Sequence, residues 1–564
     1  MTHVSSTLEN PLIVQSDKSI LLEVDNPLYG EARDAIGSFA EIVKSPEHIH
    51  TYRITNLSLW NAAASGMNAQ SICDALDRYS KYEVPKNVRT DINDYVSRYG
   101  RLKLKKSGKL LLLESEDSAL IAEVWNNKSI KQYLLRRIDK LTLEVKNENR
   151  GHIKQALTEL GFPVKDLAGY TEGDFLPIDL LDLTKEKKSF SLRKYQKDAI
   201  SAFYAGGSVY GGNGVIVLPC GAGKTVIGMG IITNLKYNTL IICPNIVAAR
   251  QWIDELVDKT TITRKDIGEY SGDIKEIKPI TIATYQILSH RNRKTDSFEH
   301  LDLFSKKNWG LIIYDEVHLL PAPVFKITAG IQSKRRLGLT ATLVREDGKE
   351  RDVFSLIGPK TYDAPWKELE RQGWIAEAIC NEIRIPMPEN QRLKYAMATD
   401  KRKYRIAAEN PHKFKIVRQI IEYHRKRSDK ILVIGVYVDQ LSKISEMLSA
   451  PMICGKTQNK ERQRLYDQFR RGELDLLVVS KVANFAIDLP DASVAIQVSG
   501  TFGSRQEEAQ RLGRILRPKE NGSVAHFYSI VTKDTKDQDF SAKRQIFLTE
   551  RGYNYTISDG FKDL

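Results

Sequence analysis

Short, uninterrupted apolar runs recur through the second two thirds of the chain, separated by stretches with helical spacing. The first set is VIVL (215–218), LII (240–242), ITIA (280–283), LIIY (311–314) and LGLT (337–340). The set after Trp374 is ILVI (431–434), LLVV (476–479), VAIQV (494–498) and VAHFYSI (524–530). Uninterrupted runs are typical of strands buried on both faces, as in parallel sheets covered by helices. Two successive sets predict two doubly wound α/β domains, with a nucleotide at the carboxyl ends of their strands.

The first 120 residues follow a different pattern. Residues 11–26 alternate as two short strands, and helical spacing follows at 32–43, 58–64, 68–79 and 87–99. The stretch RLKLKKSGKLLLLE (101–114) alternates Leu with Lys or Arg, turns at Ser107-Gly108 and continues as an apolar arm. Three helices followed by such a hairpin resemble a winged-helix unit with a basic wing, while a solvated strand face would give the same pattern. We predict one unit over residues 1–120.

A small α/β segment is predicted over residues 121–185. Its elements are helical spacing at 129–138 and 151–160, an apolar strand at 141–145 and a linker at 179–188. The two parallel-sheet domains then occupy residues 186–375 and 376–564. The expected fold class is therefore α/β, with two tandem doubly wound domains preceded by small N-terminal α+β domains.

Composition narrows the class of protein. A chain of 564 residues is long enough for three to five domains at roughly 100–200 residues each. Hydrophobic residues make up 41% and charged residues 28%, which excludes a wholly disordered chain. With 85 Lys and Arg against 71 Asp and Glu, the net charge of +14 permits a polyanionic partner. The pattern has no membrane span, secretory signal or clustered cysteines, so we expect a cytoplasmic protein without membrane contact.

The string LPCGAGKT (218–225) follows the strand 215–218 directly and precedes an apolar helix. Backbone N–H groups of a Gly-rich turn can surround phosphate oxygens, and the following helix N-terminus adds a favourable dipole. Lys224 can neutralise the β- and γ-phosphates, and Thr225 can ligate Mg²⁺. We predict an ATP site cradled by Gly221, Ala222 and Gly223, although Leu218 stands where the general pattern has Gly. The alternative is an ordinary strand–turn–helix connection.

The strand 311–314 ends in Asp315-Glu316-Val317-His318. A carboxylate at the end of a buried strand is poorly placed for packing, so Asp315 is predicted to hold Mg²⁺ through water. Glu316 is predicted to orient and deprotonate the attacking water. His318 is either part of the coupling machinery or a satisfied core histidine.

The string QRLGRILR (510–517) places Arg514 and Arg517 three apart, on one face of a predicted helix. A positioned guanidinium near the γ-phosphate stabilises charge in the transition state. These arginines belong to the second predicted domain, whereas Lys224 and Glu316 belong to the first. Hydrolysis would therefore require the two domains to close on each other, unless the arginines are merely solvated.

The order of these motifs resembles the superfamily 2 helicases, and closely the XPB (xeroderma pigmentosum group B) helicase family, especially its shorter prokaryotic members. The supporting strings are LRKYQ (192–196), VIVLPCGAGKT (215–225), YDEVHLLPA (314–322), GLTATLVRED (338–347), GSRQEEAQRLGRILRP (503–518) and FLTERGYNYTI (547–557). Leu218 stands where LPCGAGK of this family has leucine. The resemblance implies two RecA-like domains and a DNA-dependent ATPase with 3′→5′ helicase activity, using ATP and Mg²⁺ in repair or transcription.

The resemblance also implies roles for individual residues. Gln196 would read the adenine edge beside Arg193, or simply be a polar residue at a helix start. Thr340 and Thr342 would relay the nucleotide state to the nucleic-acid groove, and Arg345, Glu346 and Asp347 would stand at the point of strand separation. Asp488, Gln510 and Arg511 would line the nucleotide site from the second domain, although Ala486 replaces the Gly or Ser of many relatives.

The basic stretch 389–405 resembles the helical thumb insertion of the family, placed around 385–410. Tyr395 and Tyr404 within it would stack on bases, or the stretch would be a solvated helix face. Residues 1–120 and 121–185 resemble the family's N-terminal and damage-recognition-like domains. The implied partners are DNA at single-strand/duplex junctions and a nuclease or a repair or transcription factor, for a monomer associated with the nucleoid. A duplex translocase that does not separate strands and a non-hydrolysing scaffold are the alternatives.

Overall fold

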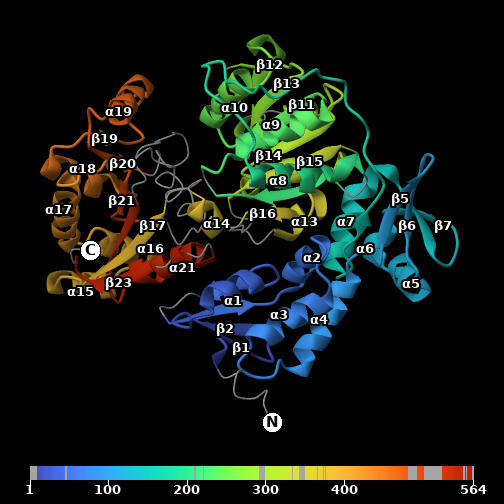
Figure 1. The fold of residues 1–564 in the computed structure, drawn as a ribbon, viewed down its shortest axis with the longest axis horizontal. Coiled ribbons are helices and arrows are strands. Elements are labelled where there is room, and N and C mark those ends of the chain that lie inside the picture. Colours follow the sequence, from blue (N-terminus) through green and yellow to red (C-terminus); the bar gives the residue numbers. More distant parts are fainter. Residues whose placement is uncertain are drawn as a thin grey trace.

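The structure is a computed structural model of the chain. It describes residues 9–561 except 45–47, 209–210, 220, 273, 291–298, 333, 342–349, 365, 373, 375–376, 481–491, 501–523, 551–552 and 554. Figure 1 shows two large lobes, each built on a sheet with helices on its faces, and two smaller N-terminal units. Within the described residues, no helix is both long and apolar enough to cross a membrane.

The first N-terminal unit is an antiparallel sheet packed against helices. Its strands pair in the order β1-β2-β4-β3 and are β1 (Leu12–Val14), β2 (Ser19–Glu23), β3 (Glu41–Lys44) and β4 (Ile49–Arg53). Its helices are α1 (Tyr29–Ile36), α2 (Asn56–Ala64), α3 (Ala69–Tyr79) and α4 (Lys86–Arg98). The helix expected over 32–43 is wrong beyond Ile36, because Gly37 ends it and the β-branched pair Ile42-Val43 forms an edge strand.

The second unit is a five-stranded sheet in the order β7-β8-β6-β5-β9. Its strands are β5 (Lys103–Ser107), β6 (Leu110–Glu114), β7 (Leu134–Arg137), β8 (Thr142–Val145) and β9 (Lys165–Asp166). Its helices are α5 (Ser118–Asn126), α6 (Lys128–Lys131) and α7 (Arg150–Glu159).

Two expectations are corrected in this second unit. The hairpin β5–β6 is not a wing on the preceding helices, because β6 pairs with β8 and its Leu113 lies opposite Leu143 in the core. The boundary expected at residue 120 therefore falls within helix α5 of one unit. The helix expected over 129–138 ends at Lys131 and is followed by β7, which pairs with β8.

The first large lobe carries a parallel sheet in the order β12-β13-β11-β14-β15-β10-β16. The strands are β10 (Asn213–Val217), β11 (Thr239–Cys243), β12 (Ile267–Tyr270), β13 (Ile280–Thr284), β14 (Leu311–Asp315), β15 (Arg335–Thr340) and β16 (Lys360–Asp363). The helices are α8 (Lys194–Tyr204), α9 (Lys224–Leu235), α10 (Ile246–Lys259), α11 (Tyr285–Leu288), α12 (Ala322–Gly330), α13 (Glu350–Leu356) and α14 (Trp366–Arg371). All five strands predicted for this lobe are present.

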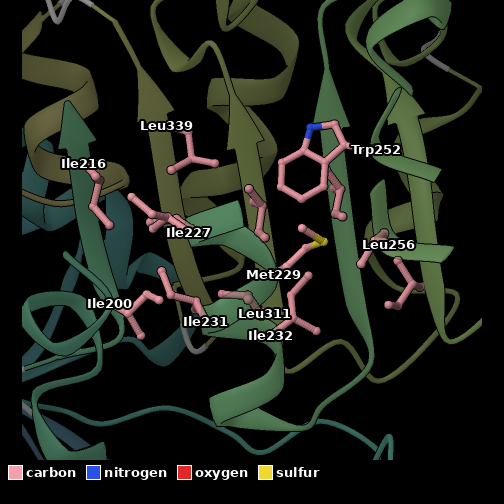
Figure 2. Close-up of a cluster of buried hydrophobic side chains, with 14 of the residues drawn as sticks. Ile200, Ile216, Ile227, Met229, Ile231, Ile232, Trp252, Leu256, Leu311 and Leu339 are labelled. Carbon is pink, nitrogen blue, oxygen red and sulfur yellow. The ribbon is translucent and has the colours of Figure 1, made fainter. Parts of the chain in front are cut away.

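The core of this lobe explains why these runs form strands. Apolar side chains of β10, β11, β14 and β15 pack against the inward face of α9, including Ile227, Met229 and Ile231, which are 0% exposed. Figure 2 shows this layer, with Trp252 of α10 above Met229. β12 and β16 were not predicted because they are four-residue segments with mixed polarity, IGEY and KTYD.

The second large lobe repeats the architecture in the order β19-β20-β18-β21-β22-β17-β23, with parallel pairing. The strands are β17 (Ala378–Ile385), β18 (Ile431–Gly435), β19 (Met452–Ile453), β20 (Leu476–Ser480), β21 (Val494–Gln497), β22 (Ala525–Thr532) and β23 (Tyr555–Asp559). The helices are α15 (Glu389–Ala396), α16 (Asp400–Ala408), α17 (His412–Arg425), α18 (Val438–Leu448), α19 (Asn459–Arg471) and α21 (Lys536–Glu550). The α/β class with two tandem parallel-sheet domains is confirmed.

The second N-terminal unit is docked closely on the first lobe. Gly151 at the start of α7 lies so close to α12 that a Cβ there would be 2.3 Å from the backbone oxygen of Ala329. Lys154 of α7 donates a hydrogen bond to Gln332 at 2.9 Å, and both side chains are buried. The N-terminal unit thus contacts the sheet at the end opposite to the nucleotide-binding loop.

Candidate nucleotide-binding and catalytic site

The phosphate loop connects β10 to α9 and contains two glycines in the left-handed region. Gly221 has a φ of 84° and Gly223 a φ of 82°, conformations that residues with a side chain rarely adopt. A Cβ at Gly223 would also lie 2.7 Å from Nε2 of Gln196. Helix α9 starts after Gly223 without a side-chain cap, so its first N–H groups face the loop. This geometry fits an anion such as a phosphate.

Lys224 and Glu316 form an ion pair across the carboxyl ends of β10 and β14. Their side chains are 13% and 15% exposed. Glu316 adopts the left-handed conformation (φ 49°, ψ 56°), which costs about 1–3 kcal/mol in a residue with a side chain. The sharp turn aims its carboxylate back at the phosphate loop. The predicted phosphate lysine and the predicted base are therefore in direct contact.

The electrostatics of Glu316 favour the ionised form that a general base requires. Although burial acts to raise its pKa, the charges of Lys224 and His318 hold the pKa of Glu316 below its ordinary value. Its Oε2 atom is buried, accepts no hydrogen bond of ordinary geometry from the described residues and lies 3.4 Å from Nδ1 of His318. An acceptor of this kind suits a water molecule that must be oriented for attack.

Asp315 ends β14 beside this pair and carries the opposite pKa shift. Burial, together with the negative charge of Glu316, raises the pKa of Asp315 to about 6. Its oxygens accept hydrogen bonds from the indole N–H of Trp252 and the backbone N–H of Glu316, both at 3.0 Å. A buried carboxylate with neutral donors needs a positive charge nearby, and carboxylate and hydroxyl oxygens are ligands that Mg²⁺ prefers. Asp315 therefore fits a magnesium site, and Thr225, the second residue of α9, stays a predicted ligand.

His318 and Thr340 are brought together by the structure. The Nδ1 atom of His318 lies 2.8 Å from the hydroxyl of Thr340, and the two residues are 5% and 0% exposed. Nδ1 also lies 3.4 Å from the Glu316 carboxylate. His318 thus connects the end of β14 to the end of β15, and its burial fits both the coupling role and a core histidine.

Gln196 lies beneath the phosphate loop and is 3% exposed. Its Oε1 accepts a hydrogen bond from the backbone N–H of Arg193 at 3.0 Å, and its Nε2 donates to the carbonyl of Ala222 at 3.3 Å. The amide therefore both caps α8 and contacts the loop. The Arg193 guanidinium lies 4.2 Å from the ring centre of Trp374, in the segment between the two lobes.

Tyr195 contacts the phosphate loop, although it was not predicted from the sequence as a site residue. Its hydroxyl donates a hydrogen bond to the carbonyl of Ala222 at 2.6 Å, and the residue is 6% exposed. The signal that could have identified it is a hydroxyl-bearing aromatic residue next to Gln196 at the start of an amphipathic helix.

One predicted contact residue in the second lobe is corrected. Tyr404 of α16 is 1% exposed, its hydroxyl donates to the carbonyl of Gly500, and its ring packs edge-on against Phe540. It is a core residue and does not present its ring to a nucleic acid. Tyr395 of α15 is half-buried, and its hydroxyl accepts a hydrogen bond from the backbone N–H of Lys536 at 2.8 Å.

Nine of the predicted site residues lie outside the described residues. They are Thr342, Arg345, Glu346, Asp347, Asp488, Gln510, Arg511, Arg514 and Arg517. Their roles stay predictions.

Two tandem parallel sheets, a phosphate loop after β10 and an acidic pair after β14 define a two-lobed nucleotide-hydrolase scaffold of the helicase class. Comparison of the sequence with known protein families agrees with this class and identifies the family more narrowly. Family models match residues 12–139 (Helicase conserved C-terminal domain), 189–345 (Type III restriction enzyme, res subunit) and 369–563 (ERCC3/RAD25/XPB C-terminal helicase).

The chain is 54% identical to the DNA 3'-5' helicase XPB of Mycobacterium tuberculosis over 552 residues, covering 98% of both chains. It is 52% identical to the protein of the same name from Kineococcus radiotolerans, covering 98% of this chain and 97% of the relative. The helicase/translocase subunit XPB/SSL2 of the general transcription and DNA repair factor IIH of Saccharomyces cerevisiae is 32% identical, over 97% of this chain and 71% of the relative. The chain belongs to the XPB helicase family.

Proposed function

We propose that the chain is an ATP-dependent 3′→5′ DNA helicase that acts at single-strand/duplex junctions in repair or transcription. The observation that carries the proposal is the contact of Lys224 with Glu316 beside Asp315, at the carboxyl ends of two parallel strands. The names of the relatives that match the whole length support DNA as the substrate and 3′→5′ as the polarity.

The residues of the first lobe have separate roles in binding and hydrolysing ATP. Lys224 leaves Glu316 for the phosphate oxygens, so nucleotide binding releases the carboxylate to orient a water molecule and take its proton. Asp315 and Thr225 would hold Mg²⁺, which when bound supplies positive charge to the β- and γ-phosphates. The hydrogen bonds that Tyr195 and Gln196 donate to the carbonyl of Ala222 stabilise the conformation of the phosphate loop.

The second lobe would complete the site. Arg514 and Arg517, with Gln510, Arg511 and Asp488, are proposed to reach the nucleotide when the lobes close. Thr340 and Thr342 would pass the nucleotide state to the DNA side, where Arg345, Glu346, Asp347 and Tyr395 are proposed to act. The chain would work as a monomer in the cytoplasm, at the nucleoid, beside a nuclease or another repair or transcription factor.

Turnover of ATP by purified variants, with and without DNA, tests this proposal. Glu316→Gln removes the base but keeps the shape, so kcat should fall about 10²–10⁴-fold while nucleotide binding persists. Lys224→Ala should lower nucleotide affinity as well as kcat. Lys197→Ala, an exposed lysine of α8, is the matched control and should behave as the wild type. Undiminished hydrolysis in Glu316→Gln and Lys224→Ala would contradict the assignment.

A second candidate activity is translocation on duplex DNA without strand separation. The combined helicase/translocase name of the 32% identical yeast relative favours considering it. Displacement of a third strand from a triplex, without unwinding of a 3′-tailed duplex, would support this second activity over the first.

A further inference from the structure

A tryptophan outside the motifs touches the predicted magnesium ligand. Trp252 lies in the middle of α10 and is 1% exposed. Its indole N–H donates a hydrogen bond to Oδ2 of Asp315 at 3.0 Å. Figure 2 shows the indole within the apolar layer above α9, with its ring nitrogen at the upper edge. A single polar atom on an otherwise apolar side chain therefore reaches the catalytic carboxylate from inside the core.

The type of donor matters for a metal site. The indole N–H is neutral and cannot accept a proton, so it orients a carboxylate without cancelling its charge. A lysine or arginine in this place would pair with Asp315 and compete with a cation. The backbone N–H of Glu316, also neutral, fixes the other oxygen at 3.0 Å. Asp315 is thus held in one orientation while its negative charge is kept for a ligand.

Trp252 also ties Asp315 to the phosphate loop. A Cβ at Gly228, one turn along α9 from Lys224, would lie 2.4 Å from the Cη2 atom of the indole. The ring therefore rests directly on the helix that begins at the phosphate loop. From the other side, the hydroxyl of Tyr285 donates to the backbone oxygen of Asp315 at 3.0 Å. The position of the carboxylate relative to the loop is set by these contacts.

We propose that Trp252 is a positioning residue for the divalent cation of the nucleotide site: its indole N–H holds the Asp315 carboxylate in the orientation that binds Mg²⁺ next to the phosphates. The inference rests on the proposed function and names a residue on which that site depends. Partners that orient metal ligands in this way typically contribute 10–100-fold to metal affinity.

The test compares Trp252→Phe with Trp309→Phe. Phenylalanine keeps an aromatic ring but has no N–H. Trp309 is a matched control: it is 0% exposed in the same lobe, and its indole N–H donates to the carbonyl of Leu303 at 2.9 Å, away from the site. The affinity of each variant for a fluorescent ADP is measured over a Mg²⁺ titration and in excess chelator, so turnover is not needed.

In Trp252→Phe, the Mg²⁺ concentration that gives half of the gain in ADP affinity should rise about tenfold. Affinity in chelator should not change, and kcat should recover at high Mg²⁺. Trp309→Phe should match the wild type. Should Trp252→Phe misfold, the isosteric benzothienyl analogue of tryptophan at position 252 removes the N–H alone and should give the same shift.

Two results would overturn the inference. One is the same Mg²⁺ dependence in Trp252→Phe, Trp309→Phe and the wild type. The other is an equal loss of ADP affinity with and without Mg²⁺, which would mean that the indole only supports the fold. Wild-type protein without Mg²⁺-dependent nucleotide binding would instead contradict the proposed function, which separates the two failures.

Discussion

Two buried charge clusters lie at opposite ends of one strand, β15. Beyond its amino end, Asp166 receives Arg150 at 2.8 Å and Lys154 at 3.1 Å, and Arg336 of β15 is buried nearby. At its carboxyl end, the hydroxyl of Thr340 lies 2.8 Å from Nδ1 of His318, which in turn lies 3.4 Å from the Glu316 carboxylate of the Lys224–Glu316 pair. Both clusters combine acids and bases that are mostly withdrawn from water, yet they are built for different tasks.

The difference lies in what compensates each carboxylate. Burial acts to raise the pKa of Asp166, but Lys154 and Arg150 hold it far below its ordinary value. At the other end Asp315 receives only neutral donors, and its pKa is raised to about 6. A carboxylate saturated by the protein's own cations stabilises a fold, whereas one left short of positive charge is available to a ligand. The direction of the pKa shift therefore distinguishes Asp166 from Asp315.

The largest effect is expected from neutralising each carboxylate in turn. Asp166→Asn leaves Arg150, Lys154 and Arg336 buried without their acid, so stability should fall by about 3–5 kcal/mol. Asp315→Asn removes a charge that burial disfavours but turns an NH2 group toward one of the two N–H donors, so stability should fall by less than in Asp166→Asn while ATP turnover is lost. Thermal unfolding measures the stability of both variants, and ATPase assays measure their turnover. The larger loss of stability should occur in Asp166→Asn and the loss of turnover in Asp315→Asn.

Equal effects of the two substitutions on stability and on turnover would contradict the assignment of different roles to Asp166 and Asp315. A loss of ATP turnover per folded molecule in Asp166→Asn would give that cluster a catalytic role. A strong loss of stability in Asp315→Asn would make the site at the carboxyl end structural.

The sequence predicted the functional cluster but not the structural one. Lys224 and the pair Asp315-Glu316 follow uninterrupted apolar runs, and the carboxyl ends of parallel strands meet at one edge, so their contact could be expected. Arg150, Asp166 and Arg336 stand in no motif: Arg150 pairs with Asp166 through the fold of the second N-terminal unit, and the docking of that unit on the first lobe brings Arg336 close to them.

The same reasoning explains the errors in the fold. Strands buried on both faces were found because their apolar runs are unbroken, while the partner of the 101–114 hairpin depended on long-range pairing with β8. Tyr404 was predicted to contact DNA because its neighbours in the sequence are basic. The helix α16 also has a buried face, and Tyr404 lies on that face. The contact of Trp252 with Asp315 was not predicted, because a single polar atom on an otherwise apolar side chain gives no recognisable sequence pattern.

A second prediction concerns the pH dependence of the structural cluster. Burial lowers the pKa of Lys154 to about 8 from an ordinary value of 10.5. Between these values the unfolded chain binds more protons than the folded one, so this group makes stability rise with pH. At about 1.4 kcal/mol per pH unit, the gain from pH 8 to 9.5 is about 2 kcal/mol.

Urea unfolding of the wild type and of Lys154→Met across this range isolates the contribution. Methionine fills a similar volume and does not titrate, so the rise attributed to Lys154 should be missing in the variant. A wild-type curve parallel to that of Lys154→Met would show that the lysine keeps its ordinary pKa despite its burial.

The last prediction concerns how much the docking of the second N-terminal unit on the first lobe contributes to stability. In Gly151→Ala the new Cβ would meet the backbone oxygen of Ala329 at 2.3 Å, and backbone cannot yield as a side chain does. The unit must shift away from α12, which should cost about 1–3 kcal/mol. Gly30→Ala, in α1 with nothing within 4 Å, is the matched control and should gain up to about 1 kcal/mol from helix propensity. Equal melting temperatures for the two variants would mean that the close contact of α7 with α12 is dispensable for stability.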